Sequence, residues 1–300
     1  MAPRLKWNII VVEAAQIVTS YSTSVTLRQL FYRLVSRGSV PNTQSAYKTL
    51  SKVTAEARRE GWFPDLIDRT RSIEKWQDFS DPGQAQRWLA AIYRRDRSDN
   101  QEQQIFIGVE KAGMVVQLQS WFSDYGLPII ALSGYSSQTF VKTVGESMMG
   151  ETYDNDRPSH LIYAGDFDPS GEDIDRDFVE RLEEYIVNNT SMLLSDVFAG
   201  VERIALLPEH IEEYQLPEYP GKETDSRKWE FIEKHGKLVQ VELDALDPDD
   251  LHILYKTAVD EYFDYDVYEA VVEEEQKDEE ILRRLSDKIM DVRAEIEEEE

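Results

Sequence analysis

The chain has 300 residues, a formal net charge of −26, 41% hydrophobic residues and no cysteine. This length allows one large or two ordinary domains with a proper core. The absence of cysteine excludes disulfides, thiolate zinc sites and a cysteine nucleophile, and the four histidines lack ligand spacing. No apolar run could span a bilayer, no signal-peptide segment is present and no P-loop motif occurs. We therefore expect a soluble, cytoplasmic protein with no membrane partner.

The charge is unevenly distributed along the chain. Residues 1–105 hold 16 Lys and Arg against 11 Asp and Glu, a net of +5, whereas the other 195 residues hold 17 against 48. A mildly basic head could face DNA while an acidic body faces water, or the acidity could reflect a salt-rich cytoplasm. Composition alone leaves both explanations open.

The first 78 residues favour a small helical DNA-binding domain. We predict helices over Trp7–Val18, Leu27–Arg37 with Thr26 as N-cap, and Thr43–Glu60. On the third helix Ala46, Leu50, Val53 and Ala57 face inward, and the basic residues Lys48, Lys52, Arg58 and Arg59 lie elsewhere on its circumference. A hairpin over Gly61–Trp76, with Arg69 and Arg71, would complete a winged helix. A generic helical domain with a solvated basic face is the alternative.

The rest of the chain predicts an α/β domain after a connector. Residues 79–103 form the connector, with one short helix near Ala85–Tyr93. From residue 104 strands and helices alternate, which implies a parallel sheet covered on both faces. The predicted strands are Ile105–Val109, Leu127–Leu132, His160–Ala164 and Arg203–Leu207, and the predicted helices are Lys111–Tyr125, Ser137–Met148 and Glu172–Val187.

An acidic helix over residues 261–300 closes the chain, after an α/β domain that we place at 104–260. Its apolar residues recur at intervals of three and four positions (Ile281, Leu285, Ile289, Val292 and Ile296). One face of the helix is therefore apolar, which predicts docking on the body or on a second subunit.

The segment LIYAGDFDPSGEDI, residues 161–174, is the most informative in the sequence. A strand-like run ends in Asp166 and Asp168, and alternation along an extended segment would put both carboxylates on one side. Hard divalent cations such as Mg²⁺ favour oxygen ligands of this kind. The alternative is structural, because aspartates also cap helices and stabilise turns.

A third carboxylate follows another strand of the same predicted sheet. Glu110 comes directly after IFIGV, and ligands of parallel α/β sheets bind at the edge where such strands end. If the two strands are neighbours, Glu110, Asp166 and Asp168 converge on one or two Mg²⁺ ions that could steady a phosphodiester. Lys111 beside them could balance charge or touch phosphate, or could be a solvated lysine at a helix start.

These segments resemble the toprim domain, and more closely the A subunit of topoisomerase VI and its meiotic double-strand-break relatives. Four segments match in the order of that family, over about residues 104–246. They are GVEKAGMVVQL (108–118), LSGYSSQT (132–139, with Ser136 in place of a proline), GDFDPSGEDI (165–174) and VELDAL (241–246).

The resemblance extends into the helical head and indicates a nucleophile. TLRQLFY (26–32) is similar to the family segment that ends in a catalytic tyrosine, which corresponds to Tyr32, with Gln29 in place of an acidic residue. Arg28 lies one turn earlier, where its guanidinium would lower the phenol pKa and could hold a phosphate. An amphipathic tyrosine at the edge of a small core is the alternative, and Tyr47 is a competing tyrosine.

The resemblance implies Mg²⁺-dependent cleavage of double-stranded DNA through a covalent tyrosyl intermediate in a homodimer, with the metal ligands supplied by the partner subunit. ATP-driven strand passage would need a separate ATPase subunit. A toprim endonuclease that uses water as the nucleophile is the first alternative. A non-catalytic DNA-binding scaffold is the second.

Overall fold

The computed structural model describes residues 5–21, 25–66, 76–134 and 136–299, with the backbone alone for residues 286, 287 and 289–299. The chain divides into two compact units. The first comprises Met1–Thr70, Glu102–Ser123 and Leu127–Tyr262, so it unites the helical head with the α/β body. The second comprises Arg71–Gln101, Asp124–Gly126 and Phe263–Glu300.

The head of the first unit contains the three predicted helices, α1 (Trp7–Ser20), α2 (Leu27–Ser36) and α3 (Gln44–Arg59). The hydroxyls of Thr26 and Thr43 accept hydrogen bonds from the first turns of α2 and α3, which fixes where these helices begin. Thr54 takes the place expected of Val53 in the core, because Val53 is only half-buried.

The predicted hairpin of the winged helix is not confirmed. Residues 61–66 of the predicted hairpin form no strand, and residues 67–75, with Arg69 and Arg71, lie outside the described part of the chain. The observed head is therefore a three-helix unit.

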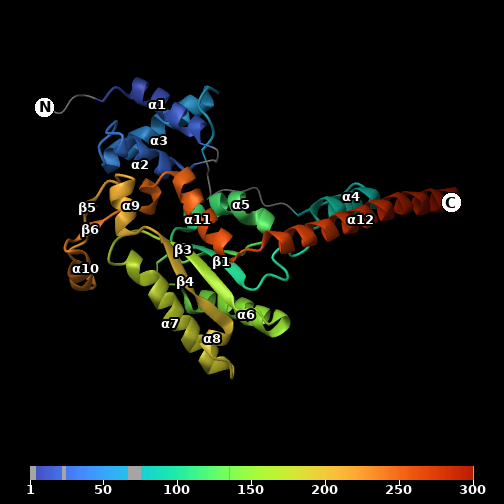
Figure 1. Ribbon diagram of the computed structural model, residues 1–300. Coiled ribbons are helices and arrows are strands. Elements are labelled where there is room, and N and C mark those ends of the chain that lie inside the picture. The colour runs from blue at the N-terminus through green and yellow to red at the C-terminus, as the bar shows by residue number, and fades with distance from the viewer. Residues whose placement is uncertain (1–4, 22–24, 67–75, 135, 300) are drawn as a thin grey trace. The chain divides into compact units, whose positions relative to one another are not determined.

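The body of the first unit contains the predicted parallel sheet (Figure 1). Its strands are β1 (Gln104–Val109), β2 (Ile129–Ala131), β3 (Ser159–Ala164) and β4 (Phe198–Ala205), in the order β2-β1-β3-β4. Every residue of β1 and β3 is buried, which explains their continuous apolar runs. The fourth strand starts five residues earlier than predicted, because its first half pairs with β3 although it contains Ala199 and Gly200, which are uncommon in strands.

Helices cover both faces of the sheet, as predicted (Figure 1). One face carries α6 (Gln138–Asn155), α7 (Gly171–Asn189) and the short α8 (Leu194–Val197), which share a core with Phe106, Leu161 and Tyr163. The opposite face carries α5 (Val115–Phe122) and α11 (Pro248–Tyr262). On this side Tyr255 is fully buried and donates a 2.6 Å hydrogen bond to the carbonyl of Gly108.

Short elements after β4 return the chain to the edge of the sheet. They are α9 (Pro208–Glu213), the paired strands β5 (Tyr219–Pro220) and β6 (Val239–Gln240), α10 (Lys228–His235) and a 3-10 turn, η3 (Leu243–Ala245). Phe167 and Val241 then exchange two backbone hydrogen bonds of 2.9 Å in an antiparallel bridge. This bridge brings the VELDAL segment against the Asp-x-Asp loop.

The second unit consists mainly of α4 (Pro82–Ile92) and the long acidic helix α12 (Tyr265–Glu299). Arg97 donates to the carboxylate of Glu275, which is 2% exposed, over distances of 2.6 and 3.1 Å. On the predicted apolar face, Ile281 and Leu285 are 57% and 45% exposed. The side chains of Ile289, Val292 and Ile296 lie outside the described residues. Among the described residues, no helix combines the length and apolarity needed to cross a membrane.

Candidate metal and nucleophile site

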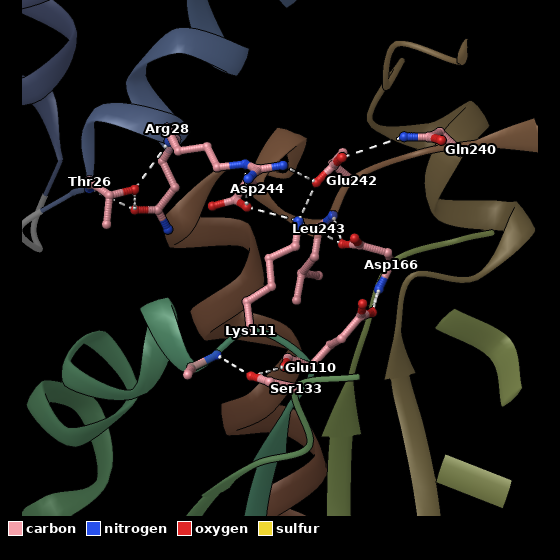
Figure 2. A network of polar contacts seen from close by, with 12 residues as sticks. Thr26, Arg28, Glu110, Lys111, Ser133, Asp166, Gln240, Glu242, Leu243 and Asp244 are labelled. Atoms are coloured by element: carbon pink, nitrogen blue, oxygen red, sulfur yellow. Dashed lines mark hydrogen bonds and ion pairs between the residues drawn. The ribbon is translucent and has the colours of Figure 1, made fainter. Parts of the chain in front are cut away.

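The first two predicted carboxylates lie at the ends of neighbouring strands. β1 pairs with β3 in parallel register, and the Glu110 N–H continues this pairing with a 2.9 Å hydrogen bond to the carbonyl of Ala164. The Ser133 hydroxyl donates to the Glu110 carbonyl and accepts from the Ala112 N–H, both at 3.0 Å, which fixes the turn after β1 (Figure 2). The expected convergence of Glu110 and Asp166 is therefore present.

Glu110 and Asp166 form an electrostatically unfavourable pair. Glu110 Oε2 accepts a 2.7 Å hydrogen bond from the Asp166 N–H. Burial, and then the Asp166 carboxylate, raise the pKa of Glu110 to about 7. Burial also raises the pKa of Asp166, with a contribution from Glu242, although Lys111 opposes the shift. Neighbouring acids with raised pKa values are a common mark of a functional site.

Asp168 occupies the structural role that the sequence left open. Its Oδ1 accepts a 2.7 Å hydrogen bond from the N–H of Gly171, the first residue of α7, and so stabilises the turn that leads into this helix. Its partner thus differs from those of Asp166, although the two residues share one loop.

Arg203 on β4 stabilises the loop between β3 and α7, a role that the sequence did not suggest. Its guanidinium donates to the carbonyls of Asp166 at 2.7 Å and Gly171 at 3.0 Å. A Cβ at Gly171 would lie 2.4 Å from the Asp166 carbonyl oxygen, so the tight loop requires glycine there.

A second acidic pair, Glu242 and Asp244, completes the site. The bridge between Phe167 and Val241 places the Leu243 N–H 2.7 Å from Asp166 Oδ1, to which it donates. The VELDAL segment is one of the four on which the resemblance rests, and its alternating acids repeat the pattern of Asp166 and Asp168. That pattern was the available signal for these two residues, which the sequence interpretation did not assign to the site.

Lys111 is not the solvated lysine of the alternative interpretation. Its Nζ contacts Glu242 at 2.5 Å, Asp244 at 2.9 Å and Asp166 at 2.9 Å (Figure 2). Burial disfavours the charged amine, but these three carboxylates outweigh burial and raise the pKa of Lys111. The expected charge-balancing role is therefore present.

Helix α2 is tied to the same edge through Arg28 and Gln29. Arg28 Nη2 donates to Glu242 at 2.8 Å, and its Nε lies 3.5 Å from Asp244 (Figure 2). Gln29 accepts from the Thr26 N–H in a capping box and donates a buried 2.7 Å hydrogen bond to Gln117 on α5. These bonds place the predicted nucleophile helix on the acidic edge of its own chain.

Tyr32 is 8% exposed, and its pKa is raised rather than lowered. Burial is the main cause, followed by Glu242, and Arg28 opposes both without overcoming them. Arg28 lowers the pKa of Tyr32 as predicted, but burial and Glu242 raise it by more, so the net shift is upward. Tyr32 and Tyr47 line one pocket of about 230 Å³ beside Arg28, so position alone does not separate the two tyrosines.

The donor set of the edge has the oxygen chemistry that a divalent cation prefers. The acids Glu110, Asp166, Asp168, Glu242 and Asp244 outnumber the cations Arg28 and Lys111 by three. Within the described ranges, however, no group of three or more such side chains is arranged to hold a metal ion. In this arrangement Lys111 Nζ contacts three of the carboxylates, and backbone N–H groups bond to Glu110, Asp166 and Asp168.

Comparison of the sequence with models of protein families and with curated proteins found no match. The function is therefore inferred from the residues and their geometry.

Proposed function

We propose that the protein is a Mg²⁺-dependent DNA strand-cleaving enzyme of the topoisomerase VI A type, a homodimer in which each site combines the Tyr32 helix and the carboxylates of one chain rather than of two. The observation that carries this proposal is the meeting of three groups at one sheet edge. Glu110 and Asp166 follow adjacent parallel strands, and Arg28 ties the Tyr32 helix to the same edge. In this proposal Glu110, Asp166 and Asp168 hold Mg²⁺, which stabilises charge on the reacting phosphate.

The chemistry assigned to Tyr32 is covalent. Its phenolic oxygen attacks a DNA phosphorus, forms a phosphotyrosyl ester and displaces a deoxyribose hydroxyl, so no water is consumed and the bond can be reversed. The phenol must lose its proton, and Arg28, 5.7 Å from the ring centre, is placed to favour the phenolate and to hold the phosphate. Lys111 can neutralise a second phosphate oxygen.

Double-stranded DNA is the proposed partner of the helical head. The side chains of Lys48, Lys52 and Arg59 on α3 are exposed, and the first 105 residues carry a net charge of +5. Such a surface attracts the phosphate backbone. We further propose a cytoplasmic, DNA-associated location, and a separate ATPase subunit if strand passage is driven by ATP.

One observation favours a hydrolytic toprim endonuclease as the second candidate. Tyr32 is buried with a raised pKa, which suits a tyrosine that packs rather than one that attacks. Water would then be the nucleophile at the same carboxylates. A non-catalytic DNA-binding scaffold is the third candidate, in which the acids around Lys111 serve only to hold the helical head on the sheet edge.

The deciding experiment incubates supercoiled DNA with the protein and Mg²⁺, denatures the sample and analyses it with and without protease. The proposal expects protein-linked DNA ends that are lost in Tyr32→Phe and in Asp166→Asn. Tyr47→Phe, which changes the other tyrosine of the pocket, is the matched control and should cleave normally. Free ends from Tyr32→Phe would establish the hydrolytic candidate. DNA binding without any cleavage by the wild type would establish the scaffold.

A further inference from the structure

Glu242 bridges the two cations of the site through a single oxygen atom. Its Oε2 accepts from Arg28 Nη2 at 2.8 Å and from Lys111 Nζ at 2.5 Å (Figure 2). One cation belongs to the nucleophile helix and the other to the end of β1. An anionic oxygen held between a guanidinium and an ammonium is the arrangement in which proteins also bind phosphate oxygens.

Glu242 is the member of its acidic pair that a ligand can displace. The Asp244 side chain is 5% exposed, whereas that of Glu242 is 14% exposed and that of its partner Arg28 is 50% exposed. Arg28 also lines the pocket that contains Tyr32. A ligand that enters this pocket therefore meets Arg28 and then the carboxylate of Glu242.

The backbone at Glu242 is fixed independently of its carboxylate. Val241 is held by its bridge to Phe167, and the Leu243 N–H is held by Asp166. The side chain itself is retained by ion pairs and by a 3.4 Å hydrogen bond that Gln240 donates to its other oxygen. It can rotate away while Asp244 and Asp166 continue to contact Lys111.

We propose that the Glu242 carboxylate occupies a phosphate-binding position between Arg28 and Lys111 and must be displaced when DNA enters the site. Glu242 thus acts as an internal competitor of the substrate, and an empty site keeps its two cations neutralised. The identification of the displacing anion as a DNA phosphate depends on the proposed function. The competition itself depends only on the contacts of Glu242.

The test measures DNA binding in EDTA, where the proposed cleavage cannot occur. A fluorescein-labelled duplex of about 20 base pairs is titrated with wild type, Glu242→Gln and Glu233→Gln, and the anisotropy is followed from about 50 to 300 mM KCl. Glu233 is an exposed glutamate on α10, so the control removes the same charge away from the site. Glutamine at 242 keeps the size of the side chain, and a thermal melt of each variant checks that it is folded.

Glu242→Gln should bind the duplex about tenfold more tightly than Glu233→Gln. This factor corresponds to one charge-assisted hydrogen bond to a phosphate for which the carboxylate of residue 242 no longer competes. The slope of log K against log[KCl] should steepen by about 0.9 for each additional phosphate that the protein neutralises. The tighter binding should disappear in the double variant Arg28→Gln/Glu242→Gln, because the guanidinium that receives the phosphate is missing. A general change in surface charge would survive in that double variant.

Two outcomes would overturn the inference, and they are distinguishable. If Glu242→Gln and Glu233→Gln bind DNA with equal affinity and equal slope, the internal competition is refuted while the proposed function stands. If neither wild type nor Glu242→Gln binds the duplex at the lowest salt concentration, the DNA-directed function fails, and the inference fails with it.

Discussion

At the scale of single residues, Glu110 couples the site to stability. Its folded-state pKa of about 7 lies above the ordinary value of 4.5, so the folded protein holds this proton more firmly than the unfolded chain. The resulting stability is present at low pH and is lost as pH rises through about 7. Glu110→Gln removes the titration. Between pH 5 and pH 8, the free energy of unfolding of wild type should therefore fall by on the order of 2 kcal/mol more than that of Glu110→Gln.

Urea unfolding of Glu110→Gln and wild type at the two pH values measures this difference in the free energy of unfolding. Glu233→Gln is the control, because that side chain is exposed and should leave the pH dependence unchanged. A constant difference between Glu110→Gln and wild type across this range would show that Glu110 has an ordinary pKa.

Gly171 gives a second prediction at this scale. Alanine there would place its Cβ 2.4 Å from a backbone oxygen that cannot rotate away, whereas alanine at Gly150 in α6 would meet nothing within 4 Å. Gly171→Ala should lower the free energy of unfolding by about 1–3 kcal/mol, and Gly150→Ala should leave it equal or raise it by up to about 1 kcal/mol. Thermal melts compare the two, and equal effects would refute the steric argument.

The sequence predicted that Glu110 and Asp166 lie close together, and the structure has them in contact. Glu110 and Asp166 were predictable because each directly follows an apolar strand, and ends of adjacent parallel strands share an edge. The contacts of Lys111 were not predictable, because the bridge between Phe167 and Val241 is what brings Glu242 and Asp244 to it. Pairings between residues so far apart in the chain leave no local pattern in the sequence.

At the scale of elements, the starts of α2 and α3 follow local chemistry, whereas the start of β4 does not. Thr26 is the N-cap of α2 as predicted, and Thr43, predicted as the first residue of the third helix, is the N-cap of α3, since a hydroxyl at the N-cap acts within its own turn. β4 begins at Phe198 rather than Arg203, because pairing with β3 includes a first half whose Ala199 and Gly200 carry little local strand signal. The contact between α2 and α5 was also beyond prediction, because glutamine is usually a surface residue and Gln29 is buried.

The hydrogen bond between Gln29 and Gln117 leads to the prediction at the scale of elements. Gln29→Ala removes both the cap on the Thr26 N–H and the donor to buried Gln117, and should lower the free energy of unfolding by about 2 kcal/mol. In the double variant Gln29→Ala/Gln117→Ala, the loss of unfolding free energy should be about 1 kcal/mol smaller than the sum of the losses in the two single variants. Urea unfolding of the four proteins measures this coupling.

The cap of α3 provides the control for this cycle. Thr43→Ala removes a cap of similar kind that has no bond to α5, so it should be additive with Gln117→Ala. Additivity in the Gln29 cycle as well would show that the buried amide contact does not couple the two helices.

At the scale of the whole molecule, the net charge of −26 decides how the protein responds to salt. Repulsion among exposed carboxylates acts over about a Debye length and is screened by salt, whereas the buried pairs around Lys111 are screened much less. The urea midpoint should therefore rise between about 0.1 and 1 M KCl, while affinity for duplex DNA falls steeply over the same range. Urea is required because guanidinium chloride is itself a salt. A midpoint that falls with KCl would mean that exposed ion pairs, rather than the excess of acids, dominate the electrostatics of folding.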